Sequence, residues 1–150
     1  MCSSDLTCIP LRPNPTVTTA PTIGQPQPVV RHATQPTRVG VIHFGSTSAA
    51  MNEALDVLDD EDVHLDAMRL RAFPFPKSVR DFIAAHDKVF VVEQNRDAQM
   101  RAMLVNELDI DPARLLRVLH FDGTPINARF IAAAIRKTLI AQKVDRKSVV

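Results

Sequence analysis

The sequence feature that most constrains the fold is an apolar run that ends abruptly in polar residues. Residues 88–97 read K-V-F-V-V-E-Q-N-R-D, in which Val89 to Val92 are β-branched or aromatic and the next four are polar. A strand that is apolar on both faces needs cover on both sides, so this run predicts the central strand of a parallel sheet between two layers of helices. Ligands and partners of such sheets lie just beyond the carboxyl ends of the strands, where residues 93–96 would lie.

Segments on both sides of this run alternate between strand and helix patterns. Strands are expected at 38–44, 63–70 and 115–121, and the helix after the first of them has an apolar face of Met51, Ala54, Leu55 and Leu58. Three further helices are expected after Pro76, after Asp97 and after Thr124, with Asp97 and Thr124 as caps and the last helix covering about 126–142. This alternation predicts an α/β fold, a three-layer α/β/α sandwich around a mostly parallel sheet of four to five strands.

Both ends of the chain differ from this pattern. Residues 7–37 hold seven of the eleven prolines, so we expect a proline-rich linker at 7–27, with residues 29–31 extended enough to add a short edge strand. Residues 1–6 (M-C-S-S-D-L) and 145–150 (D-R-K-S-V-V) resemble translations of a sequencing-library adaptor. We interpret both as adaptor-derived rather than as chance matches, because they stand at opposite termini. The reading frame is then expected to be truncated upstream.

Composition argues against several classes of function. A net charge of +1 offers no electrostatic basis for binding nucleic acid or anionic lipid. There is no apolar run near 18 residues and no secretion signal, so a cytoplasmic protein that does not enter a membrane is expected. Cys2 and Cys8 are the two cysteines, and without a C-x-x-C pair they predict neither a zinc site nor a disulfide framework.

Two groups of polar residues at predicted strand ends are candidates for chemistry. The turn at Gly45–Ser48 precedes a helix and could hold a phosphate, but it lacks a G-x-G-x-x-G or Walker lysine, which favours ordinary helix capping by its hydroxyls. Glu93 and Arg96 could act as an acid and an anion clamp. They could equally form structural ion pairs, either with each other or with Arg71.

Histidines and phenylalanines near the strand ends also have two interpretations each. His43 and His120 have no nucleophile at a recognisable spacing, so we expect histidines with satisfied hydrogen bonds. Phe73 and Phe75, bracketed by prolines, predict a rigid apolar knuckle that serves either as a core plug or as a docking surface. The sequence contains no thiamine diphosphate motif, no cysteine run for an iron–sulfur cluster and no dinucleotide fingerprint.

Four longer strings carry a resemblance to a known family. They are V-G-V-I-H-F-G-S-T-S at 39–48, R-L-R-A-F-P-F-P at 69–76, V-F-V-V-E-Q-N-R-D at 89–97 and V-L-H-F-D-G-T-P-I-N-A-R-F-I at 118–131. In this order and spacing they resemble the carboxyl-terminal domain of the alpha subunit of 2-oxoacid:ferredoxin oxidoreductases, with most likeness to the 2-oxoglutarate type. The resemblance covers about residues 28–142.

The resemblance implies a fold and a role. The fold is similar to the carboxyl-terminal domain of transketolase, with a short antiparallel first strand assigned to Val29–Arg31 and a domain at 28–144. The whole enzyme would decarboxylate a 2-oxoacid oxidatively, transfer the acyl group to coenzyme A and reduce ferredoxin. Thiamine diphosphate, Mg²⁺ and the iron–sulfur cluster would be held by the rest of the alpha subunit and by the beta subunit.

No catalytic, cofactor-binding or metal-binding residue is therefore assigned to this chain, and it is expected to be inactive alone. Its expected contribution is a polar edge that contacts neighbouring domains or subunits. That edge consists of Ser46, Thr47, Ser48, Arg71, Glu93, Gln94, Asn95, Arg96, His120 and Asp122. The alternative is a free-standing doubly wound module that binds a small anion at Gly45–Ser48.

Overall fold

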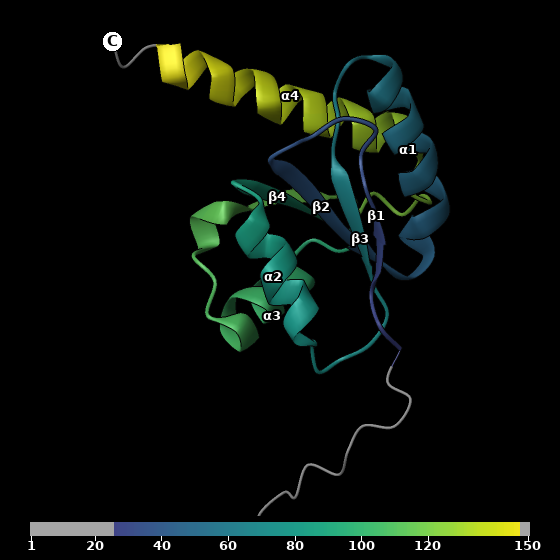
Figure 1. Cartoon of the computed structure of the whole chain (residues 1–150). Coiled ribbons are helices and arrows are strands. Elements are labelled where there is room, and N and C mark those ends of the chain that lie inside the picture. The colour runs from purple at the N-terminus through teal and green to yellow at the C-terminus, as the bar shows by residue number, and fades with distance from the viewer. Residues whose placement is uncertain (1–25, 148–150) are drawn as a thin grey trace, which may run out of the picture.

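A single five-stranded sheet forms the centre of the molecule (Figure 1). The computed structural model describes residues 26–147, so the expectations for 1–25 and 148–150 lie outside the described residues. The strands lie in the order β1-β3-β2-β4-β5. Their bounds are β1 Val29–Arg31, β2 Val39–Phe44, β3 Asp66–Leu70, β4 Lys88–Glu93 and β5 Leu115–Leu119.

Strand β1 is the antiparallel member of the sheet, as the resemblance implied. Val29 lies opposite Arg69 and Arg31 opposite Ala67, whereas β3, β2, β4 and β5 pair in parallel. The apolar strand β4 is interior, between β2 and β5, and Val89–Val92 are completely buried. It is β2, however, that occupies the middle of the five.

Helices cover both faces of the sheet, which confirms the predicted three-layer α/β/α architecture (Figure 1). Helices α1 (Ser48–Asp60) and α4 (Ala128–Lys147) pack on one face, where Val41 and Phe90 of the sheet join one core cluster. Helices α2 (Lys77–Ala85) and α3 (Gln99–Leu108) pack on the other, against Ile42 and Val91. Alternate residues of each interior strand therefore supply two cores.

Helix α1 buries the predicted face of Met51, Ala54, Leu55 and Leu58. The predicted caps of the two later helices are wrong. The Asp97 carboxylate accepts from Arg96 Nε at 3.0 Å and caps no helix. Thr124 likewise donates to Asp122 at 2.7 Å, and α4 is capped two residues after Pro125 by Asn127, whose Oδ1 accepts from the Phe130 amide at 3.0 Å.

Two short 3₁₀ turns, η1 (Gly45–Thr47) and η2 (Pro112–Arg114), complete the fold. Across residues 26–147, no helix combines the length and the apolar character that crossing a membrane requires.

Candidate functional site

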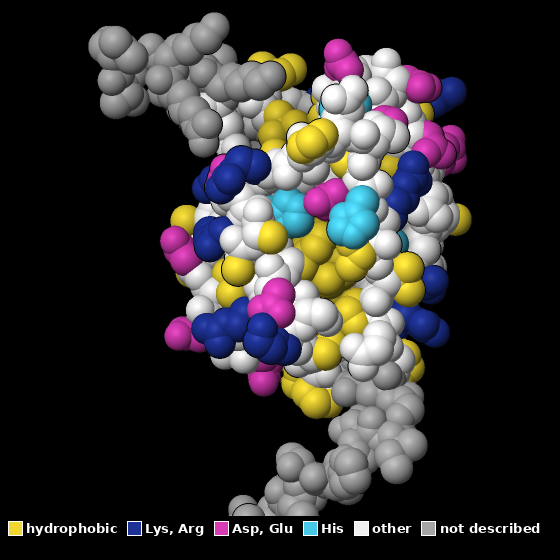
Figure 2. Space-filling view, viewed as in Figure 1, with side chains coloured by type: hydrophobic (Ala, Val, Ile, Leu, Met, Phe, Trp, Pro, Cys, Tyr) yellow, Lys and Arg dark blue, Asp and Glu magenta, His cyan; other side chains and the backbone are white. Residues whose placement is uncertain are grey.

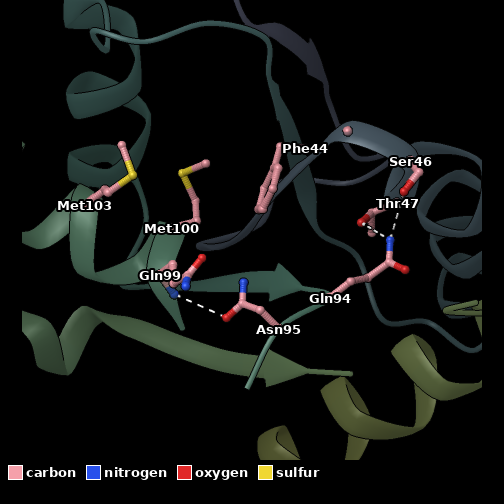
Figure 3. Close-up of a pocket in the computed structure, with 9 residues that line it drawn as sticks. Phe44, Ser46, Thr47, Gln94, Asn95, Gln99, Met100 and Met103 are labelled. Atoms are coloured by element: carbon pink, nitrogen blue, oxygen red, sulfur yellow. Dashed lines mark hydrogen bonds between the residues drawn. The ribbon is translucent and has the colours of Figure 1, made fainter. Parts of the chain in front are cut away.

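The carboxyl ends of the parallel strands form a groove with a polar wall and an apolar wall. Its larger part is a pocket of about 490 Å³ that opens between the η1 turn after β2 and the start of α3. Four of the predicted edge residues line it, and they are Ser46, Thr47, Gln94 and Asn95. Figure 3 shows Phe44, Met100 and Met103 across from them, so the pocket combines side-chain amides and hydroxyls with apolar side chains.

The polar wall is held together by the side-chain amide of Gln94. Gln94 Nε2 donates to Ser46 Oγ and to Thr47 Oγ1, both at 3.1 Å (Figure 3). The backbone of Gly45 has φ +59, a left-handed conformation that suits glycine and turns the chain out of β2. No side chain caps the start of α1, so the expectation that these hydroxyls cap its amides is wrong. Both hydroxyl oxygens instead accept hydrogen bonds from Gln94, and these bonds connect the end of β2 to the end of β4.

Glu93 caps the helix that follows β4. Its side chain is fully buried, and the carboxylate accepts from the Met100 amide at 2.8 Å, the Arg101 amide at 2.9 Å and Asn95 Nδ2 at 2.8 Å. These amides belong to the first turn of α3, where a helix has unpaired N–H groups and favours negative charge. The expected ion pairs of Glu93 with Arg96 or Arg71 are therefore wrong, and its side chain offers no surface to a partner.

The two arginines of the predicted edge remain at the surface. Arg96 pairs with its neighbour Asp97 through Nε at 3.0 Å, and both side chains are largely exposed. Arg71 lines a second pocket of about 250 Å³ between the β3–α2 loop and α3. Among the described residues no hydrogen bond or ion pair involves the Arg71 side chain. Arg71 therefore supplies an uncompensated positive charge at the groove's edge.

The second pocket continues the first one. Both are lined by Phe44, Gly45, Met100 and Met103, and we call the two together the strand-end groove. Phe73 and Phe75 also line it, with ring centroids 5.3 Å apart in an edge-to-face arrangement. Phe75 packs against the core, whereas Phe73 is 52% exposed. Phe75 is therefore the core plug, whereas the docking role stays a prediction for the exposed ring of Phe73.

His120 and Asp122 lie at the end of β5 and line neither pocket of the strand-end groove. His120 is buried, its ring packs edge-on against Phe130, and its Nε2 lies 3.4 Å from Asp122 Oδ1. Hydrogen bonds from the Thr124 hydroxyl and amide lower the pKa of Asp122. These contacts of His120 organise the β5–α4 loop, and the satisfied hydrogen bonds expected of its ring stay a prediction.

His43 contradicts the corresponding prediction. It is buried on the α1 face of the sheet, and its Nδ1 has no hydrogen-bond partner. Ser48 lies beside it rather than in the strand-end groove. The predicted edge thus divides into the groove, the buried cap Glu93, the β5 end and a hollow near His43.

Sequence reasoning missed the apolar wall of the groove. Met100 and Met103 recur with Leu104 and Leu108 at helical spacing, which predicts only that the four residues share one side of α3. Leu104 is fully buried, whereas Met103 is 37% exposed and lines the groove. The spacing i, i+3 identifies one side of a helix, but it does not say where the sheet beneath that side ends.

Between residues 26 and 147 there is no group of three or more His, Cys, Asp or Glu side chains that could hold a metal ion. Both cysteines precede this region, so it supplies no thiolate for a cluster. No lysine or arginine lines the 490 Å³ pocket, so no cationic side chain there favours an anion at Gly45–Ser48.

Comparison with known sequences finds no matching family model. The alpha subunit of 2-oxoacid:ferredoxin oxidoreductase 2 from Aeropyrum pernix is 30% identical over 112 residues, which is 73% of this chain. The chain spans 17% of the length of that relative.

Solved structures share the fold. A 2-oxoglutarate:ferredoxin oxidoreductase from Magnetococcus marinus, solved with 2-oxoglutarate, coenzyme A and succinyl-CoA, matches 75% of this chain and 20% of its own with a TM-score of 0.67 and 24% identity. A split-gene transketolase in an inactive beta4 tetramer matches 76% of this chain and 41% of its own, with a TM-score of 0.61 and 17% identity. These likenesses establish the transketolase-like α/β fold predicted from the sequence.

Proposed function

From its relation to the alpha subunit of 2-oxoacid:ferredoxin oxidoreductases, we propose that this chain is the carboxyl-terminal structural domain of such a subunit. In this proposal the domain has the bounds 28–144 and docks onto the rest of the subunit through the strand-end groove. The whole enzyme decarboxylates a 2-oxoacid, forms an acyl-coenzyme A and reduces ferredoxin in the cytoplasm. We favour 2-oxoglutarate as its substrate, in keeping with the resemblance in sequence.

The catalytic parts belong to other domains in this proposal. The described residues offer no ligand set for Mg²⁺ or for an iron–sulfur cluster, which supports placing these groups and thiamine diphosphate in the rest of the alpha subunit and in the beta subunit. The 150-residue chain should then show no 2-oxoglutarate-dependent reduction of ferredoxin when supplied with thiamine diphosphate, Mg²⁺ and coenzyme A. Turnover by the chain alone would contradict this assignment.

The observation that carries the docking role is an exposed apolar groove at the edge where the chain enters the fold. Phe73 is 52% and Met103 37% exposed within it. Because β1 is antiparallel, Val29 lies beside Arg69, near the carboxyl end of β3, so the chain enters β1 from the groove's side of the sheet (Figure 1). A preceding domain joined through the predicted linker at 7–27 would be tethered at this edge, beside the groove.

Charge substitutions in the full alpha subunit test the docking role. Phe73→Asp or Met103→Asp should weaken assembly with the beta subunit or loosen the subunit itself, because a buried carboxylate would have no partner. Size-exclusion chromatography and ferredoxin reduction measure the two effects. Val57→Asp is the matched control, since Val57 is 38% exposed but belongs to α1, away from the groove. Equal behaviour of all three variants would refute docking through the groove.

A further inference from the structure

A small hollow on the opposite face of the sheet has features that the docking role does not use. It encloses about 150 Å³ between β1, β2, β3 and the start of α1. Its polar lining consists of Arg31, His43, Ser48, Asn52 and Arg69. This volume is roughly that of five water molecules, which is enough for a carboxylate or phosphate group.

His43 is the first sign that the hollow is a binding site. Its side chain is 4% exposed, its Nδ1 has no partner, and no hydrogen bond to its ring is recorded among the described residues. A buried polar group without a partner is uncommon and costly, so such a group calls for an explanation. A ligand that accepts an N–H from the imidazole would provide one.

Arg69 is the second sign. It lies directly beside His43 in the parallel register of β2 and β3, and Val29 of β1 lies on its other side. Within residues 26–147 no hydrogen bond or ion pair to its guanidinium is recorded, whereas Arg31 is held by Asp56 at 2.5 Å. The charge of Arg69 is therefore not balanced by a carboxylate of the described residues. Its planar guanidinium offers five N–H donors.

The start of α1 adds to the same preference. Ser48 is the first residue of α1, and no side chain caps this end of the helix. The 3₁₀ turn η1 runs directly into α1, and Ser48 Oγ donates to the Gly45 carbonyl at 3.0 Å, so the terminus contributes the positive end of the helix dipole. Asn52, one turn further on, contributes a side-chain amide that can donate. The helix dipole and the Asn52 amide are thus complementary to an anionic oxygen, as Arg69 and His43 are.

We propose that this hollow binds a small oxyanion, a carboxylate or a phosphate, through Arg69 and His43. Arg69 provides the charge, the neutral imidazole of His43 donates one hydrogen bond, and Asn52 and the α1 terminus complete the site. This proposal is independent of the docking role of the strand-end groove, which lies on other residues.

Binding is testable on the 150-residue chain by NMR. Inorganic phosphate in one titration and acetate in another should shift the His43 imidazole and Ser48 amide resonances in a saturable way. Saturation by either anion supports the site and identifies which chemistry it prefers. No saturation by either anion below about 50 mM overturns the proposal, because such weak binding would not be specific.

Matched arginine variants test the contact. Arg69→Met should weaken binding by about tenfold or more, the effect expected for a charged hydrogen bond. Arg80→Met removes the same charge from the exposed surface of α2, on the opposite face of the sheet, and should change binding by less than about twofold. Equal weakening by both variants would refute a specific site. If Arg69→Met fails to fold, His43→Gln, which keeps a donor, should retain binding while His43→Leu loses it.

Discussion

At the scale of single residues, two buried polar side chains differ in whether hydrogen bonds compensate for the cost of burying them. Glu93 is fully buried and surrounded by donors from the first turn of α3. His43 is almost as deeply buried and has no partner for Nδ1. The first residue should therefore stabilise the fold, whereas the second should limit its stability in acid.

Replacing His43 should change how stability depends on pH. Burial, followed by the charge of Arg69, lowers the pKa of His43 from 6.5 to about 4. Between these values the unfolded chain binds a proton that the folded chain does not, so stability falls as pH falls from 6.5 to 4. Across this window wild type should lose about 3 kcal/mol more than His43→Leu in urea unfolding. Parallel pH profiles of the two proteins would contradict the assignment.

Replacing Glu93 should destabilise the start of α3. Glu93→Gln keeps the size but replaces an accepting oxygen by a donating NH₂ that faces backbone amides, at a cost of about 2–3 kcal/mol. Glu107→Gln is the control, since Glu107 is exposed on the same helix and should change stability by less than about 0.5 kcal/mol. Urea unfolding measures the free energy of unfolding of both variants. Equal losses would show that the Glu93 carboxylate does not stabilise the start of α3.

At the scale of elements, β2 and α2 approach closely because β2 contains a glycine at their contact. A Cβ at Gly40 would lie 3.0 Å from Phe82 Cε1 and 3.2 Å from the His86 ring. Asp66 ties the same region together, since its carboxylate accepts from His86 Nε2 at 3.0 Å and from the Ala33 amide at 2.8 Å. Burial acts against ionisation of Asp66, yet these hydrogen bonds lower its pKa overall.

Gly40→Ala should therefore destabilise the protein by about 1–3 kcal/mol through overpacking between β2 and α2. Thermal unfolding measures the loss. Phe82→Leu in the same chain removes ring atoms from the contact, so the double variant should lose less stability than the sum of the single variants. Additive losses would show that the effect of Gly40 arises elsewhere, for example in the strand backbone.

At the scale of the whole molecule, part of the exposed apolar surface lies at the carboxyl ends of the strands. Figure 2 shows hydrophobic side chains along the middle of one face and at its lower end, with arginines and lysines to either side. Phe73 and Met103 are among the exposed large hydrophobic residues. Such a surface can be covered by a neighbouring domain, and the residues that the structure describes leave the groove open.

The open groove should bind a hydrophobic dye. We expect the 150-residue chain to enhance anilinonaphthalene sulfonate fluorescence while it is folded, and Phe73→Asp to reduce the enhancement. Val57→Asp should leave it unchanged, because Val57 lies on α1. Circular dichroism confirms that each variant is folded. Equal fluorescence from Phe73→Asp and wild type would place the exposed apolar surface elsewhere.

Local sequence pattern by itself determined the order and kind of the elements. The helical period of Met51, Ala54, Leu55 and Leu58 and the apolar run of β4 were sufficient, because side-chain periodicity follows directly from backbone geometry. The antiparallel direction of β1 came from family resemblance, since three residues carry no period that reveals direction.

Only the tertiary structure decided how the strand ends are used. Glu93 caps amides seven and eight residues later, and Gln94 bonds to hydroxyls more than forty residues earlier. His43 was expected to find a partner and has none for Nδ1, and Met103 lines the groove although it shares its helical side with the buried Leu104. Each outcome depends on which segments meet at the end of the sheet, and periodicity within one segment carries no information about that meeting.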